Sequence, residues 1–105
     1  MMRKDMSLTE LQAYFEKVLY ERGFGNQPVE EKMMLLVEEV GELAKAIRKQ
    51  QGGKIDYDRI QNYDTVQGEI ADITIVLFSL CNILDIDLFE AVKQKEIINM
   101  NREWK

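Results

Sequence analysis

The segment from Ile73 to Leu84 constrains the fold more than any other part of this sequence. It is apolar almost all round, with only isolated polar side chains within it. A buried strand would also be apolar, but a run of this length is more typical of a helix. We therefore expect a central, buried helix over roughly residues 66–84, with other helices packed against it.

Capping residues and apolar periodicity predict three further helices. Ser7 and Glu10 match a capping box that begins the first helix, and Gly23 is a typical stop. Pro28 suits the first turn of a second helix that runs to about residue 50, and Asp87 caps a last helix that runs to about residue 103. One face of the second helix is apolar; its members are Met33, Leu36, Val37, Val40, Leu43, Ala44 and Ile47.

The size of the chain predicts one domain. A length of 105 residues fits a single domain over residues 1–105, and chains of this size often gain burial by forming oligomers. The polar stretch 51–65 is a long connection of the kind that is often functional or mobile, and a short helical turn is expected near 58–63. We therefore expect an all-α protein, a four-helix-type bundle, assembled at least as a dimer.

The charge balance and the lack of histidine argue against several function classes. A net charge of −5 makes the chain a poor candidate for binding nucleic acid or an anionic membrane non-specifically. With no histidine, the usual general base, His-ligated zinc and Ser-His or Cys-His pairs are excluded. Cys81, the single cysteine, is typical of a small core residue. The N-terminus lacks an apolar signal segment and the apolar run is too short to span a bilayer, so a cytoplasmic location is expected.

Two clusters of carboxylates lie on the second and third helices, within otherwise apolar segments. Glu38, Glu39 and Glu42 fall in a wedge of about 100°, and Glu69 and Asp72 are three residues apart. Each cluster has an ordinary explanation, as a solvated glutamate face or as an acidic first turn that favours the helix dipole. Taken together they favour a metal site, because buried carboxylates are costly without a compensating cation. An all-oxygen ligand set suits Mg²⁺ or Mn²⁺ rather than Zn²⁺.

The expected chemistry of such a site is phosphoryl transfer. Mg²⁺ held by carboxylates normally keeps positions for water and for substrate phosphates. Lys95, Asn99 and Arg102 project from one face of the last helix, where they could meet phosphate oxygens. The alternative is an exposed C-terminal turn whose cations favour the helix dipole.

In these motifs the chain resembles the MazG-like nucleotide pyrophosphohydrolases of the all-α NTP pyrophosphatase superfamily. That family is marked by Glu-x-x-Glu followed, after a gap, by Glu-x-x-Asp. Glu39 to Glu42 and Glu69 to Asp72 match these two motifs, and Glu38 completes the frequent form Glu-Glu-x-Gly-Glu. The resemblance covers roughly residues 28–105 and includes the closing Lys, Asn and Arg helix.

The resemblance implies a helical bundle that forms a homodimer or a dimer of dimers. It also implies Mg²⁺-dependent cleavage of a (d)NTP to the (d)NMP and pyrophosphate, with a role in clearing abnormal or excess (d)NTPs. The implied metal ligands are Glu39, Glu42, Glu69 and Asp72. The implied catalytic residues are Glu38 and Glu39, and Glu38 would bind another metal or orient the attacking water. The implied phosphate contacts are Lys95, Asn99 and Arg102. Base recognition would fall to the loop at Gly52 and Gly53 and to the N-terminal helix.

Other functions stay open at this point. Related activities on dUTP or phosphoribosyl-ATP would use the same carboxylates with another base pocket. A non-catalytic helical interaction module, stabilised by its metal, is the main alternative outside enzymes. A coiled-coil-like partner-binding domain is a weaker alternative, because the apolar surface of 73–84 is wider than a heptad seam.

Overall fold

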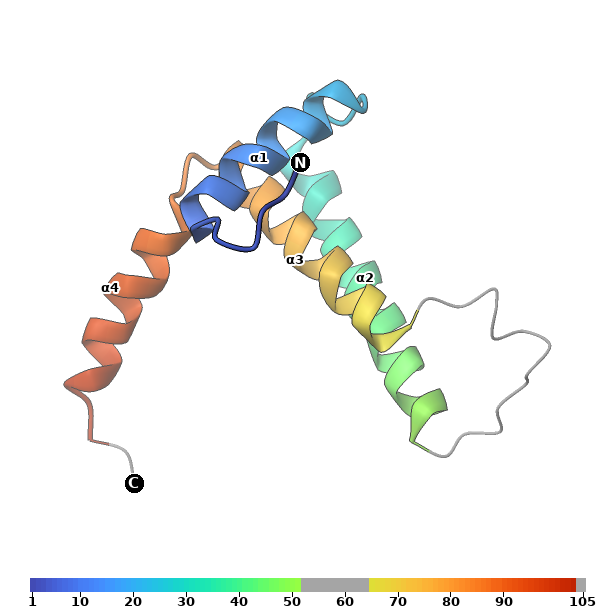
Figure 1. The fold of residues 1–105 in the computed structure, drawn as a ribbon. Coiled ribbons are helices and arrows are strands. Elements are labelled where there is room, and N and C mark those ends of the chain that lie inside the picture. Colours follow the sequence, from blue (N-terminus) through green and yellow to red (C-terminus); the bar gives the residue numbers. More distant parts are fainter. Residues whose placement is uncertain (52–64, 104–105) are drawn as a thin grey trace. The chain divides into compact units, whose positions relative to one another are not determined.

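The computed structural model describes residues 1–51 and 65–103, and those residues form four α-helices (Figure 1). Their bounds are α1 Leu8–Glu21, α2 Val29–Gln50, α3 Val66–Ile83 and α4 Leu88–Met100. No strand occurs in the two described ranges. The all-α prediction is therefore confirmed, and Ile73 to Leu84 is helical as far as Ile83. The helical turn predicted near 58–63 lies outside the described residues.

The predicted helix caps are present. Ser7 Oγ accepts a hydrogen bond from the Glu10 N–H at 3.1 Å, and Glu10 Oε1 accepts one from the Ser7 N–H at 3.2 Å. Gly23 has a φ of +92°, which suits the turn after α1, where the Phe24 N–H donates back to the Leu19 carbonyl. Local hydrogen bonds thus fix where α1 begins and ends. Because these bonds join residues that are close in sequence, the sequence predicted both ends of the helix.

The end of α4 differs from the prediction. The helix stops at Met100 rather than near residue 103, because Asn101 caps it. The Asn101 side-chain amide donates to the Ile97 carbonyl at 3.0 Å, and its backbone N–H donates to Ile98 at 3.1 Å. Lys95 and Asn99 therefore lie on α4, whereas Arg102 follows it, and the expectation that all three share one helical face is wrong for Arg102.

The chain divides into two compact units. One comprises Met1–Asn26 and Phe78–Lys105, the other Gln27–Leu77, so α3 begins in the second unit and ends in the first. In the first unit α1 packs against α4 and against the last turns of α3. The rings of Phe15 and Phe78, both buried, stack with their centroids 5.6 Å apart. The expectation of a single domain over 1–105 stays a prediction.

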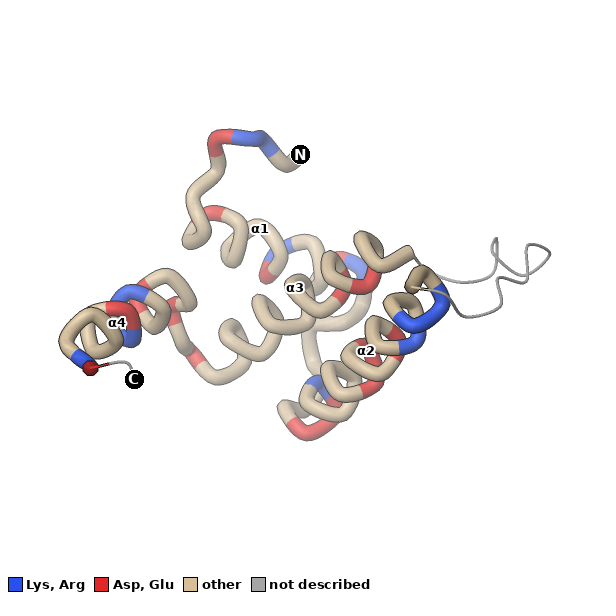
Figure 2. Tube along the Cα trace, turned by 90° about the horizontal axis from the view of Figure 1, so that it is seen from below, with Lys and Arg blue, Asp and Glu red and all other residues tan. Residues whose placement is uncertain are grey.

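In the second unit α2 and the first part of α3 lie side by side and run in opposite directions (Figure 1). Glu30 and Glu31 lie in the first turn of α2 and Arg48 and Lys49 in its last, so both ends complement the helix dipole (Figure 2). Val76 of α3 is buried. The apolar face predicted for α2 is largely uncovered, because Met33, Val37, Val40 and Ile47 are 43–60% exposed.

The length and composition of α3 meet the criteria for a membrane span, with a mean hydropathy of 1.4 over Val66–Ile83. The core helix of a soluble protein meets the same criteria. One third of this helix (33%) is buried within the chain, and it carries Glu69 and Asp72 in its first turns. Because Ile70, Leu77 and Ile83 are 40–51% exposed, the helix that the sequence predicts to be central and buried is only partly buried within the chain.

Candidate metal centre

The first turn of α3 is held by Thr65. Thr65 Oγ1 accepts a hydrogen bond from the Gly68 N–H at 3.0 Å, and its carbonyl accepts from the Glu69 N–H at 2.9 Å. This is an N-terminal cap, and it fixes where the helix begins. Glu69 and Asp72 consequently lie at the amino end of α3, where the helix dipole favours negative charge.

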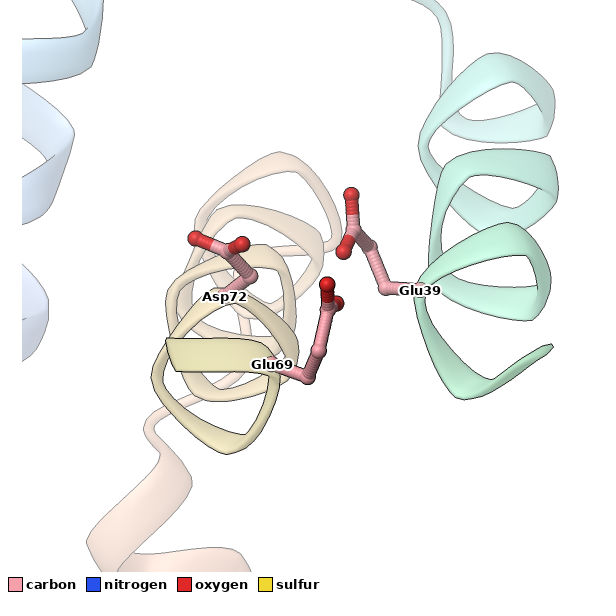
Figure 3. Close-up of side chains that lie close together, drawn as sticks. All are labelled: Glu39, Glu69 and Asp72. Carbon is pink, nitrogen blue, oxygen red and sulfur yellow. The ribbon is translucent and has the colours of Figure 1, made fainter. Parts of the chain in front are cut away.

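Three carboxylates from two helices meet in the second unit. Glu39 on α2 and Glu69 and Asp72 on α3 each offer an oxygen, and these oxygens all lie within 4.8 Å of one another (Figure 3). Glu69 is only 3% exposed, whereas Glu39 and Asp72 are half-buried. The predicted convergence of the two acidic motifs is therefore present for these three residues.

The arrangement fits a divalent cation. Oxygens that share one Mg²⁺ lie up to about 4.2 Å apart, since each is bound at about 2.1 Å. The observed spacing needs only small side-chain adjustments to reach that range. Three ionised carboxylates at such distances repel one another unless a cation or a proton compensates them. The donor set, the spacing and the burial of Glu69 together fit a hard metal ion.

Glu38 and Glu42, the other acidic residues of the α2 motif, are exposed. Neither belongs to the group of oxygens formed by Glu39, Glu69 and Asp72. Glu42 lies about one helical turn beyond Glu39 and Glu38 directly precedes it, so both are near the group along α2. Their roles as metal ligand and as catalytic residue stay predictions.

The three residues expected to contact phosphate belong to the other unit. Lys95 and Arg102 are exposed, and Asn99 is half-buried near the end of α4. Their contact with phosphate stays a prediction.

Two features were not predicted from the sequence. Lys32 on α2 is 4% exposed, and burial lowers the pKa of its ammonium group. The seven-residue spacing from Lys32 to Glu39 puts both on one face of α2, and that spacing was the signal that could have found it. The first unit also has an open cavity of about 380 Å³, whose lining includes Phe15, Tyr20, Phe24 and Ser79.

Cys81 is half-buried, and burial raises the pKa of its thiol. A raised thiol pKa keeps the sulfur protonated and poorly nucleophilic at neutral pH. This supports its interpretation as a small packing residue.

Comparisons with known proteins agree with this geometry. The family model for the MazG nucleotide pyrophosphohydrolase domain matches residues 27–101. Two crystal structures of iMazG from Vibrio DAT 722, one tagged at each end, superpose with a TM-score of 0.66 and 31% sequence identity. The matches cover 92% and 90% of this chain and 100% and 99% of the Vibrio chains. A search of curated proteins finds no match. The family match spans both acidic motifs and the chain is similar to iMazG over most of its length, so it belongs to the MazG nucleotide pyrophosphohydrolase family.

Proposed function

We propose that this protein is a Mg²⁺-dependent nucleoside triphosphate pyrophosphohydrolase that converts a (d)NTP into the (d)NMP and pyrophosphate. The observation that carries the proposal is the convergence of Glu39, Glu69 and Asp72 from two helices. Mg²⁺ is the preferred cofactor because all candidate ligands are carboxylate oxygens, and Mn²⁺ is the alternative. A role in clearing unwanted nucleotides fits this activity.

The proposed division of labour combines the observed group of Glu39, Glu69 and Asp72 with the roles that the family resemblance implies for the other residues. Glu39, Glu69 and Asp72 would hold the ion, and Glu42, one turn along α2, would supply a further oxygen. A bound ion would polarise phosphate oxygens and lower the pKa of a coordinated water. Exposed Glu38 orients the attacking water, whose oxygen forms a new bond to phosphorus as the bridge between the α and β phosphates breaks and pyrophosphate leaves. Lys95, Asn99 and Arg102 bind the phosphates.

The test is release of monophosphate and pyrophosphate from a panel of canonical and modified NTPs and dNTPs, in Mg²⁺ and in Mn²⁺. Glu39→Gln is expected to lower kcat/KM by at least about 100-fold, since metal chemistry supplies several kcal/mol and about 1.4 kcal/mol is a factor of ten. Glu31→Gln, an exposed carboxylate on the same helix, is the matched control and should keep full activity. Full activity in Glu39→Gln would remove the metal role of that residue.

The same panel separates the enzyme from the main alternative. A non-catalytic interaction module that kept its metal site would gain thermal stability from Mg²⁺ and release no pyrophosphate from any nucleotide. That result, in both metals, would replace the enzymatic proposal with the module.

We further propose that the protein works in the cytoplasm as a homodimer or homotetramer, with no nucleic-acid or membrane partner. The exposed stripe on α2 supports self-association; its members are Met33, Val37, Val40, Ala44 and Ile47. These residues alternate by four and three positions, which is the spacing of a helix-packing seam. A second copy is the simplest cover for such a stripe.

A further inference from the structure

Lys32 is a buried charged residue that the proposed mechanism does not use. It is 4% exposed and is the one buried residue of α2, a helix that lies wholly within the described range 1–51. Burial of an ammonium group costs free energy unless an opposite charge or a hydrogen bond compensates it, so lysines are seldom buried. A leucine or methionine would fill a covered helix position at lower cost. A charge at this position therefore indicates an electrostatic role.

Lys32 and Glu39 lie on the same covered face of α2. Lys32, Leu36, Glu39 and Leu43 follow one another at spacings of four, three and four residues, and all four are buried or half-buried. On this face Glu39 meets the two carboxylates of α3 (Figure 3). All of these residues belong to the unit Gln27–Leu77, so the buried ammonium group and the carboxylate centre share one unit.

The separation of Lys32 from the centre allows its charge to act without direct contact. Seven residues separate Lys32 from Glu39, which is about 10 Å along the helix axis. Both side chains lean toward the amino end of α2, so the two charges are separated by a similar distance. At an effective dielectric constant of about 20, a unit charge about 10 Å away changes the affinity for a singly charged ligand about tenfold.

The charge of Lys32 acts in opposite directions on a metal ion and on its phosphate ligand. Free Mg²⁺ is a cation, so the ammonium group repels it and weakens its binding to the three carboxylates. Pyrophosphate together with Mg²⁺ is an anion overall, so the same ammonium group attracts it. A centre that lies near Lys32 therefore favours the ion with phosphate over the ion alone.

We propose that Lys32 is a positioning residue whose buried positive charge makes the carboxylate centre select the Mg²⁺-polyphosphate part of a nucleotide over free Mg²⁺. The proposal rests on the proposed pyrophosphohydrolase activity. Lys32 contacts neither the ion nor the phosphates, and it acts through its electric field at the group of Glu39, Glu69 and Asp72. Base and sugar take no part, so the selection applies to any nucleoside triphosphate.

Calorimetric titration of the wild type and of Lys32→Met at pH 7 tests the proposal without turnover. The two probes are Mg²⁺ alone and inorganic pyrophosphate in saturating Mg²⁺. In Lys32→Met the Kd for Mg²⁺ is expected to fall at least about threefold, and the Kd for pyrophosphate to rise at least about threefold. A distorted centre would bind both probes more weakly, so the opposite shifts identify an effect of charge. Shifts in the same direction, or an unchanged Kd for either probe, would overturn the proposal.

Three further variants serve as controls. Lys32→Arg keeps the charge and should keep both Kd values within about twofold. Arg48→Met is the matched control, because Arg48 is exposed and lies nine residues from Glu39, on the opposite face of α2. Shifts in Arg48→Met equal to those in Lys32→Met would overturn the proposal, since any surface charge would then suffice. If Lys32→Met fails to fold by circular dichroism, the uncharged Lys32→Gln takes its place and should show the same opposite shifts.

Turnover separates failure of this inference from failure of the proposed function. Lys32→Met should raise the KM for the best NTP at least about threefold and leave kcat within about twofold, because the charge acts on binding. A lowered kcat with an unchanged KM would overturn the inference alone. A wild type that binds both probes but cleaves no NTP would remove the proposed activity, and the calorimetric shifts would still decide the role of Lys32. A wild type that binds neither probe would overturn both.

Discussion

At the scale of single residues, the ammonium group of Lys32 is a costly feature of this fold. Lys32 is 4% exposed on α2, and burial lowers the pKa of its ammonium group from the ordinary 10.5. Between the lowered pKa and 10.5 the unfolded chain holds more protons than the folded one, so folding stability rises with pH across that interval. At neutral pH the burial of this charged group therefore costs free energy.

Lys32→Met is expected to remove this pH dependence, since it keeps most of the side-chain volume and has no proton to lose. Each kcal/mol of stability corresponds to roughly 4–8 °C in Tm for a chain of this size. Thermal unfolding followed by circular dichroism from pH 7 to pH 10 measures the rise in the wild type and its loss in the variant. Lys17→Met, at an exposed position, should keep the rise. The same rise in Lys32→Met as in the wild type would contradict the argument.

Glu69 is expected to couple Mg²⁺ binding to the thermal stability of the protein. It is the most buried of the three clustered carboxylates, and its charge lies close to those of Glu39 and Asp72. Glu69→Gln keeps the shape of the side chain but removes its charge, so it should weaken the binding of Mg²⁺. The wild type should gain about 2.7 kcal/mol of stability at a Mg²⁺ concentration 100 times its Kd, and the variant should lose that gain. Calorimetric melts with and without Mg²⁺ measure both effects.

The matched control is Glu31→Gln, an exposed carboxylate on α2, which should keep the whole Mg²⁺-induced shift. An undiminished shift in Glu69→Gln would mean that the ion binds elsewhere.

At the scale of elements, Gln12 joins α1 to α3 and α4. Its side-chain amide donates to Asn82 Oδ1 at 3.0 Å and to the Ile86 carbonyl at 2.7 Å, and its oxygen accepts from the Leu88 N–H at 2.9 Å. The Asn82 amide in turn donates to the Gln12 carbonyl at 3.2 Å. One side chain thus holds the end of α3, the following loop and the first residue of α4.

Gln12→Ala is expected to cost about 3 kcal/mol, because it removes three hydrogen bonds worth roughly 1 kcal/mol each. The variant should therefore melt about 12 °C or more below the wild type. Urea unfolding gives the free energy directly. Gln94→Ala, at an exposed position in α4, is the control and should be nearly neutral. A loss below about 0.5 kcal/mol in Gln12→Ala would show that these bonds exchange with water at no cost.

The same elements show what the sequence can predict. The starts of α1 and α4 were predicted because Ser7 and Asp87 cap them through hydrogen bonds to residues three positions away. The end of α4 was missed because Asn101 bonds back to Ile97, which competes with further helix. A cap is a local signal, whereas competition between helix and turn depends on small energy differences.

Prediction of the site had a similar limit. Helical spacing placed Glu69 and Asp72 on one side of α3, but spacing within one helix does not say which residues of another helix face them. Glu39 turned out to face them, while Glu42 of the same motif is exposed. Periodicity also identified the apolar stripe of α2 without revealing that it is uncovered within the chain. Apolar patterning shows that a helix face packs against another surface, but it does not show which chain provides that surface.

At the scale of the whole molecule, the exposed apolar side chains of α2 and α4 make assembly important for the stability of the protein. How much apolar surface is buried depends on what covers these two helices. A single chain of 12.3 kDa leaves both surfaces exposed. The mass in solution therefore bears on every other proposal.

Val37→Glu is expected to dissociate the assembly, because it places a charge in the middle of the α2 stripe, where burial would leave it unpaired. The wild type should sediment with at least twice the mass of one 12.3 kDa chain, and the variant as a single chain. Met34→Glu is the matched control, since Met34 is 67% exposed on the same helix but lies off the stripe. Met34→Glu should keep the mass of the wild type. A Val37→Glu variant that sediments with the mass of the wild type would show that the α2 stripe lies outside the interface.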